Sequence, residues 1–233
     1  MRLKFPHYGY HDMVATHDMI VNGLHVNHLR LVMGTSMGGM QTWMWGEMYP
    51  AMMDALMPLG SLPVQISGRN RIWRNMIADL IMSSPNYDDG NYTSQPFGLK
   101  GAADLLWMVG SAPLYDQSVM PTQAAADAYF HDTVQILAQH LDANDLLYQI
   151  TSSNDYDPES QLGSIVAPLL AINSADDQIN PPELGIMQHE IARVPHGRFI
   201  LLPITPETLG HGTHTLPAIW GNYLQEFLNQ TQR

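Results

Sequence analysis

Apolar residues along the chain follow two patterns, short continuous runs and longer segments with helical spacing. Four short runs bounded by turn residues predict buried strands: 29–33, 54–60, 168–173 and 198–202. Four segments predict helices, the third of them opening on paired prolines that suit a first helical turn: 12–24, 41–49, 182–193 and 216–228. Strands that alternate with helices are typical of an α/β fold with a mostly parallel sheet.

The stretch between the second and third predicted strands has a different pattern. It contains three predicted helices separated by prolines and glycines: 69–82, 99–109 and 122–150. So much helix is too long for a single crossover between parallel strands. We therefore expect a helical cap, residues 64–157, inserted into an α/β core that consists of residues 1–63 and 158–233.

A G-x-S-x-G pentapeptide, Gly34-Thr35-Ser36-Met37-Gly38, joins the first predicted strand to the helix that follows it. This order is that of a nucleophile elbow, in which a sharp strand-to-helix turn exposes the serine hydroxyl. Ser36 would lie at the amino end of a helix, where backbone N–H groups can stabilise an oxyanion. The alternative is a glycine-rich turn with an incidental serine.

A serine nucleophile needs a base that takes its proton and a carboxylate that orients the base. Two aspartates, Asp176 and Asp177, follow the third predicted strand, and two histidines, His211 and His214, follow the fourth. We favour Asp177, which stands in an Asp-x-Ile-x-Pro pattern, and His211, which follows a glycine at a loop tip. Asp176 would then cap the turn, and His214 would pack near the last helix.

Composition excludes several classes of function. The net charge of −12, with few and scattered Lys and Arg residues, argues against nucleic acid or an anionic membrane as a partner. The absence of cysteine excludes disulfides and thiolate chemistry. Five histidines near the start lack a ligand spacing with a carboxylate, so we expect no metal and no other cofactor. With no apolar run long enough to span a bilayer, the chain should be cytoplasmic.

Several motifs resemble the homoserine O-acetyltransferase-like branch of the α/β-hydrolase superfamily. They cover nearly the whole chain: the elbow from Gly34 to Gln41 with Trp45 and Tyr49-Pro50, Arg74 to Ile77, Pro85 to Tyr92, Asp177 to Glu183, and Gly210-His211. The resemblance implies the α/β-hydrolase fold with its inserted cap. It also implies that Ser36, Asp177 and His211 act as nucleophile, orienting acid and base.

The resemblance implies two further roles. The backbone N–H of Met37 would be a donor of the oxyanion hole. Arg74 would reach the substrate pocket from the cap, with a surface or salt-bridging role as an equal alternative.

This sequence departs from the family pattern in two places. Members that make acetylhomoserine carry an aspartate after Gly-His, whereas here Gly212 follows His211. The family also has four strands and a helix before the segment where this chain begins, so the chain resembles an N-terminally truncated member. That region supplies the second oxyanion donor, whose loss costs about 3 kcal/mol in the transition state.

Without those strands, the predicted strand 29–33 would be an exposed sheet edge. Either the chain is a fragment of a longer enzyme, or residues 1–11 or a second copy of the chain cover this edge. On this ground we predict a homo-oligomer.

Three functions are compatible with these patterns. The first is a serine hydrolase that cleaves small carboxylic esters through an acyl-serine intermediate. The second is acyl transfer from acyl-CoA by the same residues. The third is a catalytically idle hydrolase scaffold that serves as an interaction module.

Overall fold

The computed structural model describes residues 4–231 of a chain that divides into two compact units. The sheet unit consists of Tyr10–Gln65 and Asp155–Arg233, and the helical unit consists of Met1–Gly9 and Ile66–Asn154. The helical unit thus begins and ends within a few residues of the predicted cap, but residues 4–9 belong to it rather than to the sheet unit. Residues 1–3 and 232–233, which the predicted core included, lie outside the described residues.

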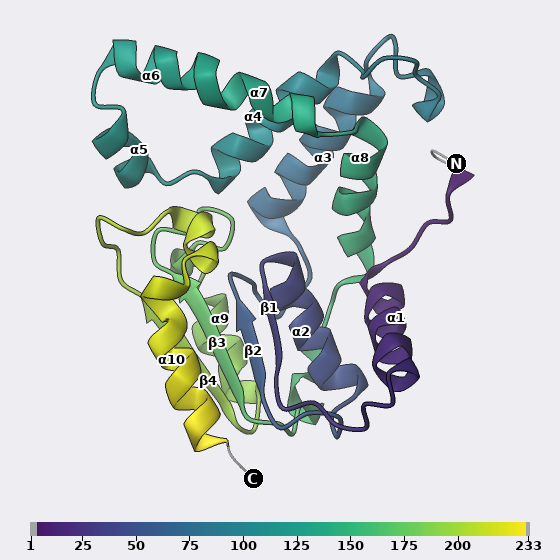
Figure 1. The fold of residues 1–233 in the computed structure, drawn as a ribbon, viewed down its shortest axis with the longest axis vertical. Helices are drawn as coiled ribbons and strands as arrows, with labels where there is room; N and C mark the ends of the chain where they lie inside the picture. The colour runs from purple at the N-terminus through teal and green to yellow at the C-terminus, as the bar shows by residue number, and fades with distance from the viewer. Residues whose placement is uncertain (1–3, 232–233) are drawn as a thin grey trace. The chain divides into compact units, whose positions relative to one another are not determined.

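The sheet unit is built on four parallel strands, which confirms the predicted α/β class. In spatial order they are β1 (Val32–Thr35), β2 (Leu56–Leu59), β3 (Leu169–Ser174) and β4 (Gly197–Leu202). All three neighbouring pairs are parallel, as Figure 1 shows. Every residue of β2 and β3 is buried, whereas every residue of the edge strand β1 is partly exposed. Covering of this edge by a second copy stays a prediction.

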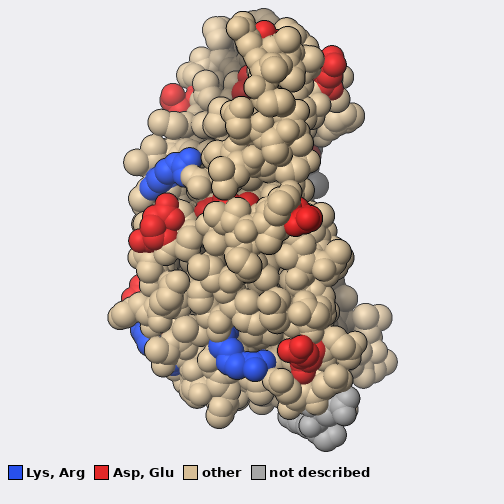
Figure 2. Space-filling model, turned by 90° about the vertical axis from the view of Figure 1, so that its left-hand side faces the viewer, with Lys and Arg blue, Asp and Glu red and all other residues tan. Residues whose placement is uncertain are grey.

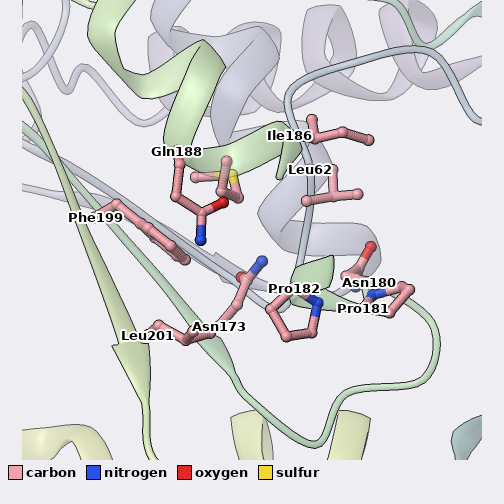
Figure 3. A pocket seen from close by; sticks show the side chains of 10 residues that line it. Leu62, Asn173, Asn180, Pro181, Pro182, Ile186, Gln188, Phe199 and Leu201 are labelled. Carbon is pink, nitrogen blue, oxygen red and sulfur yellow. The ribbon is translucent and has the colours of Figure 1, made fainter. Parts of the chain in front are cut away.

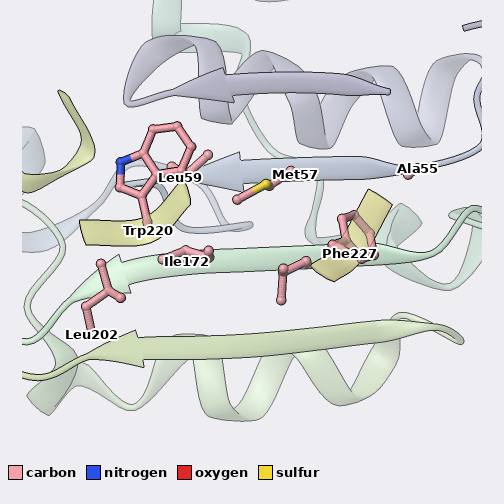
Figure 4. Packing of buried hydrophobic residues seen from close by; sticks show 8 residues of the cluster. Ala55, Met57, Leu59, Ile172, Leu202, Trp220 and Phe227 are labelled. Carbon is pink, nitrogen blue, oxygen red and sulfur yellow. The ribbon is translucent and has the colours of Figure 1, made fainter. Parts of the chain in front are cut away.

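Helices cover both faces of the sheet because side chains along each strand alternate between the faces. On one face, α10 (Pro217–Gln230) packs Trp220 and Phe227 against residues that include Met57 and Ile172, as Figure 4 shows. On the other face lie α2 (Met37–Met48) and α9 (Ile186–Glu190), with α1 (Tyr10–Gly23) packed on α2. The carboxyl ends of the strands remain at one edge of this layered core.

The helical unit contains six α-helices among its described residues. They are α3 (Gly68–Met82), α4 (Gly98–Gly110), α5 (Pro113–Val119), α6 (Gln123–Tyr129), α7 (Gln135–Leu137) and α8 (Ala143–Thr151). Helix α3 packs against both α4 and α8. Short stretches of 3-10 or π helix also occur: Asp88–Gly90, Phe130–Val134, Ala138–His140, Ser152–Asp155, Glu159–Ser164, Pro182–Leu184, Ile191–Arg193 and Gly210–Thr215.

The prediction of one helix over 122–150 was wrong, because the backbone is extended at Leu141 and Asp142. The Asp142 carboxylate caps α8 by accepting hydrogen bonds from the backbone N–H groups of Asn144 and Asp145. It also accepts hydrogen bonds from the hydroxyl of Tyr92 at 2.7 Å and the amide of Gln95 at 2.8 Å. These distant partners stabilise a break that has no proline or glycine to mark it.

The prediction of one helix over 182–193 was also wrong. Gly185 has a φ of +67°, in the left-handed region, and separates a 3-10 turn from α9. Glycine adopts this conformation without the steric cost that other residues incur. The segment therefore consists of one 3-10 turn, helix α9 and a second 3-10 turn rather than a continuous helix.

Strand β1 and helix α2 approach each other so closely at Gly34 that a side chain would collide with backbone. A Cβ atom there would lie 2.1 Å from the carbonyl oxygen of Gly38, whereas a Cβ at Gly38 would meet nothing within 4 Å. We expect Gly34→Ala to destabilise the fold by about 3 kcal/mol, as overpacking does, and Gly38→Ala to change stability by less than about 0.5 kcal/mol. Urea denaturation measures both, and equal stabilities of the two variants would contradict this close approach.

Glu47, near the end of α2, is a partly buried carboxyl group. Burial raises its pKa to about 7, a shift that nearby His11 reduces and Asp157 increases. Among residues 4–231, its Oε2 atom is buried without a hydrogen-bond partner. The folded state therefore favours the protonated form.

We expect Glu47→Gln to stabilise the fold in a pH-dependent way. The ordinary pKa of this carboxyl group is 4.5. The contribution of protonated Glu47 to the free energy of unfolding is therefore fully present below pH 4.5 and is lost as the pH rises through 7. Allowing for partial solvent exposure, the variant should gain about 1 to 2 kcal/mol at pH 8 and almost nothing at pH 4.5. Urea denaturation at the two pH values tests this, and an equal gain at both would contradict it.

Candidate active site

Ser36 lies in a strained turn between β1 and α2. Its φ of 53° and ψ of −114° place a non-glycine residue in a region that such residues rarely adopt. The turn is held by two backbone hydrogen bonds, from Ser36 N–H to the oxygen of Leu59 at 2.8 Å and from Met40 N–H to the oxygen of Ser36 at 3.0 Å. This strand, strained turn and helix have the geometry of a nucleophile elbow.

Three side chains form a continuous line of hydrogen bonds at the edge where the strands end. His211 Nε2 lies 2.8 Å from Ser36 Oγ, and His211 Nδ1 lies 2.9 Å from Asp177 Oδ2. Ser36 follows β1, Asp177 follows β3 and His211 follows β4, so the parallel sheet brings residues 175 positions apart into contact. The arrangement can move a proton from the hydroxyl to the imidazole.

Asp177 is almost fully buried, and each of its carboxylate oxygens accepts two hydrogen bonds. The donors to Oδ1 are the backbone N–H groups of Ile179 and Asn180, at 2.8 and 3.0 Å. The donors to Oδ2 are His211 Nδ1 and the side-chain amide of Asn180, at 2.9 and 3.2 Å. Burial by itself would raise the pKa of Asp177, but His211 and the bonds from Asn180 outweigh it and hold this pKa below its usual value.

The ionised Asp177 fixes the tautomer of His211. A carboxylate accepts hydrogen bonds and donates none, so we assign the imidazole proton to Nδ1. The other nitrogen, Nε2, is then free to accept the proton of the Ser36 hydroxyl. This is the state that a general base needs.

Sequence reasoning did not single out Asn173 and Asn180, which hold the loop after β2. The Asn180 amide donates to the oxygen of Gly60 at 2.9 Å, and the Asn173 amide exchanges two hydrogen bonds with the backbone of Ser61. Asn180 completes a turn with Asp177, a local pattern that the sequence could have indicated. The contacts of Asn180 with Gly60 and of Asn173 with Ser61 join distant parts of the chain and leave no local pattern in the sequence. Figure 3 shows both amides beside a small pocket, far smaller than one that buries an organic ligand.

The structure separates the two histidine candidates. The rings of His211 and His214 lie 4.9 Å apart, edge to face. Burial, with a smaller contribution from His211, lowers the pKa of His214 to about 4. His214 is therefore neutral at neutral pH and packs against the imidazole that contacts Ser36.

The two other predicted site residues lie on different units. Met37 is the first residue of α2, where backbone N–H groups have no acceptor within their own helix. Arg74 lies on α3 of the helical unit, where it donates to Asn70 and Ser153 and its guanidinium lies 4.7 Å from the ring centroid of Trp73. A contact between Arg74 and substrate stays a prediction.

Residues 4–231 include no cluster of three or more His, Asp or Glu side chains placed to hold a metal ion. No helix within the same range is long and apolar enough to cross a bilayer.

Comparison with known proteins gives consistent matches. The chain is 28% identical over 217 residues to a homoserine O-acetyltransferase of Nostoc punctiforme, an alignment that covers 82% of this chain and 59% of that protein. The crystal structure of esterase E22 superposes on this chain with a TM-score of 0.82 and 20% sequence identity. The match covers 97% of this chain and 68% of the esterase chain. The homoserine O-acetyltransferase from Bacillus anthracis matches 98% and 67% with a TM-score of 0.83 and 18% identity.

The alignments cover only part of each relative. No protein-family model matches the sequence. The chain spans less than two thirds of the length of the curated relatives that it matches. At 18 to 20% identity, the two solved structures show a shared fold and no more.

Proposed function

We propose that the chain, which belongs to the homoserine O-acetyltransferase-like branch of the α/β-hydrolase superfamily, cleaves small carboxylic esters through an acyl-serine intermediate. The observation that carries this proposal is the line of hydrogen bonds from Asp177 through His211 to Ser36. The strained backbone of Ser36 supports it, because a nucleophile on an elbow is held in such a conformation.

The proposed reaction has two halves. In the first, His211 Nε2 takes the hydroxyl proton of Ser36, and the Ser36 oxygen attacks the acyl carbon. The Met37 N–H, at the positive end of α2, stabilises the oxyanion. His211 then gives the proton to the departing alcohol, which leaves the acyl group on Ser36.

Water resolves the acyl-serine in the second half. His211 Nε2 takes a proton from the water, whose oxygen attacks the acyl carbon. The proton returns to the Ser36 oxygen as the carboxylic acid leaves. Asp177 stabilises the imidazolium that forms in each half and keeps its own charge throughout.

The second candidate is acyl transfer from acyl-CoA to an alcohol, which the names of several relatives favour. The charge distribution of the sheet unit favours an uncharged ester over this polyanionic donor. Arg30, Arg193 and Arg198 are the Lys and Arg side chains among the described residues of the sheet unit. All three lie beside the starts of β1 and β4, at the edge opposite Ser36.

The charged groups that follow the strands are negative, among them Asp176 and Asp177. On the face shown in Figure 2, Lys and Arg side chains form no continuous patch. A donor that carries several phosphate charges would therefore find little attraction at this edge.

The direct test gives the purified chain p-nitrophenyl acetate, or acetyl-CoA with and without homoserine. We expect nitrophenol release, and no release of free CoA above background in either mixture. CoA release that requires homoserine would favour acyl transfer instead. Folded protein that neither hydrolyses the ester nor reacts with an alkyl fluorophosphonate would overturn the proposal and favour an idle scaffold.

A further inference from the structure

Asp176 is a buried carboxylate beside the proposed triad that has no part in the chemistry described above. Its residue is 7% exposed, and it precedes Asp177 in the turn after β3. A carboxylate buried to this degree needs hydrogen-bond donors, because losing water without replacing its bonds is costly. The identity of those donors indicates what the side chain does.

The two oxygens of Asp176 have different partners. Oδ1 accepts a hydrogen bond from the hydroxyl of Ser174, two residues earlier. Oδ2 accepts one from the backbone N–H of Gly210, at 2.9 Å and 34 residues later. The second bond joins the turn after β3 to the residue immediately before His211.

The other hydrogen bonds of the segment before His211 are local, although Thr208 is buried. Residues 203–207 are exposed, and Thr205 and Thr208 bond to each other across a local turn. The hydroxyl of Thr213 accepts from the N–H of Leu209 at 2.8 Å, which closes the His211 turn upon itself. Neither contact ties this turn to the sheet.

We propose that Asp176 is a positioning residue, which holds the backbone at Gly210 so that the His211 imidazole stays between Ser36 and Asp177. The inference rests on the proposed function. The two adjacent carboxylates then divide the task, because Asp177 binds the ring of His211 and Asp176 binds the backbone that carries the ring. A displacement of about 1 Å in such a group can lower a rate by about 100-fold.

The test compares two substitutions at this position. Asp176→Ala removes the acceptor of Gly210 N–H, and we expect kcat to fall by about 10- to 100-fold with KM nearly unchanged. Asp176→Asn can accept from Gly210 N–H through its amide oxygen and donate to the Ser174 hydroxyl, so kcat should stay within about threefold of the original. Glu226→Ala, at an exposed carboxylate on α10, is the matched control.

A readout that needs no turnover separates this inference from the proposed function. The proton on His211 Nδ1, which is hydrogen-bonded to Asp177, should give a low-field signal in proton NMR. We expect that signal in the unaltered chain and in Asp176→Asn, and its loss or displacement in Asp176→Ala. A chain without esterase activity would overturn the proposed function, while this signal would still decide the role of Asp176.

Two outcomes would overturn the positioning role. One is a folded Asp176→Ala variant with unchanged kcat and an unchanged His211 signal. The other is a loss in Asp176→Asn as large as that in Asp177→Asn, because it would make Asp176 the orienting acid. If Asp176→Ala fails to fold, Asp176→Ser applies the same measurements, since its hydroxyl is too short to reach Gly210.

Discussion

Ser36→Ala is expected to lower kcat for p-nitrophenyl acetate by about 10⁶-fold, which leaves only the rate enhancement that substrate binding and the oxyanion hole provide. The side-chain oxygen that forms the acyl bond is lost, and His211 Nε2 has no other hydroxyl in its place. The fold should be retained, because the change removes a single atom from a partly exposed side chain. Hydrolysis kinetics and covalent labelling by an alkyl fluorophosphonate measure the effect.

The matched control for Ser36→Ala is Ser164→Ala, which removes an exposed hydroxyl whose bond is to the backbone of Gln161. This control should retain full activity and full labelling. If Ser36→Ala kept its labelling, the reactive group would be another side chain, and the proposed nucleophile would be wrong.

Asp177→Asn is expected to lower kcat by about 10⁴-fold, because it would impose the wrong tautomer on His211. The N–H groups of Ile179 and Asn180 both donate to Oδ1, so the oxygen of the new amide should occupy that position. Its NH₂ group would then face His211 Nδ1 and donate to it. The imidazole proton would move to Nε2, which could no longer accept the proton of the serine hydroxyl.

A comparison of kcat for ester hydrolysis between Asp177→Asn and Asp176→Asn tests this explanation, because both variants carry the same chemical change at adjacent positions. We expect a large loss at 177 and a small one at 176. A loss of less than tenfold at 177 would mean that the charge and orientation of Asp177 contribute little to the reaction.

The strands were predictable because their signal is local. The buried runs Leu56–Leu59 and 169–172 are apolar on both faces, as expected where helices cover a parallel sheet on both sides. Their order along the chain, with a helix after β1 and an inserted helical segment after β2, was sufficient to predict the α/β class. The elbow was visible for the same reason, since five consecutive residues carry it.

The helix breaks were not predictable because their causes are distant or subtle. Asp142 ends one predicted helix through Tyr92 and Gln95, which lie about fifty residues earlier in the sequence. Gly185 is a local signal, but glycine is also tolerated inside helices at a modest cost. Only its positive φ shows that the chain turns there.

The sequence by itself determined the kinds of element, their order and the candidates for each chemical role, because periodicity and turn residues act over a few positions. Only the tertiary structure decided that Asp177 rather than Asp176 contacts the imidazole, and that His211 rather than His214 reaches Ser36. A hydrogen bond requires its atoms to lie within a few tenths of an ångström of their places. Asp177 and His211 are 34 positions apart in the sequence, and Ser36 and His211 are 175 apart. Their side chains reach those places only when the strands have aligned and the turns beyond them are fixed.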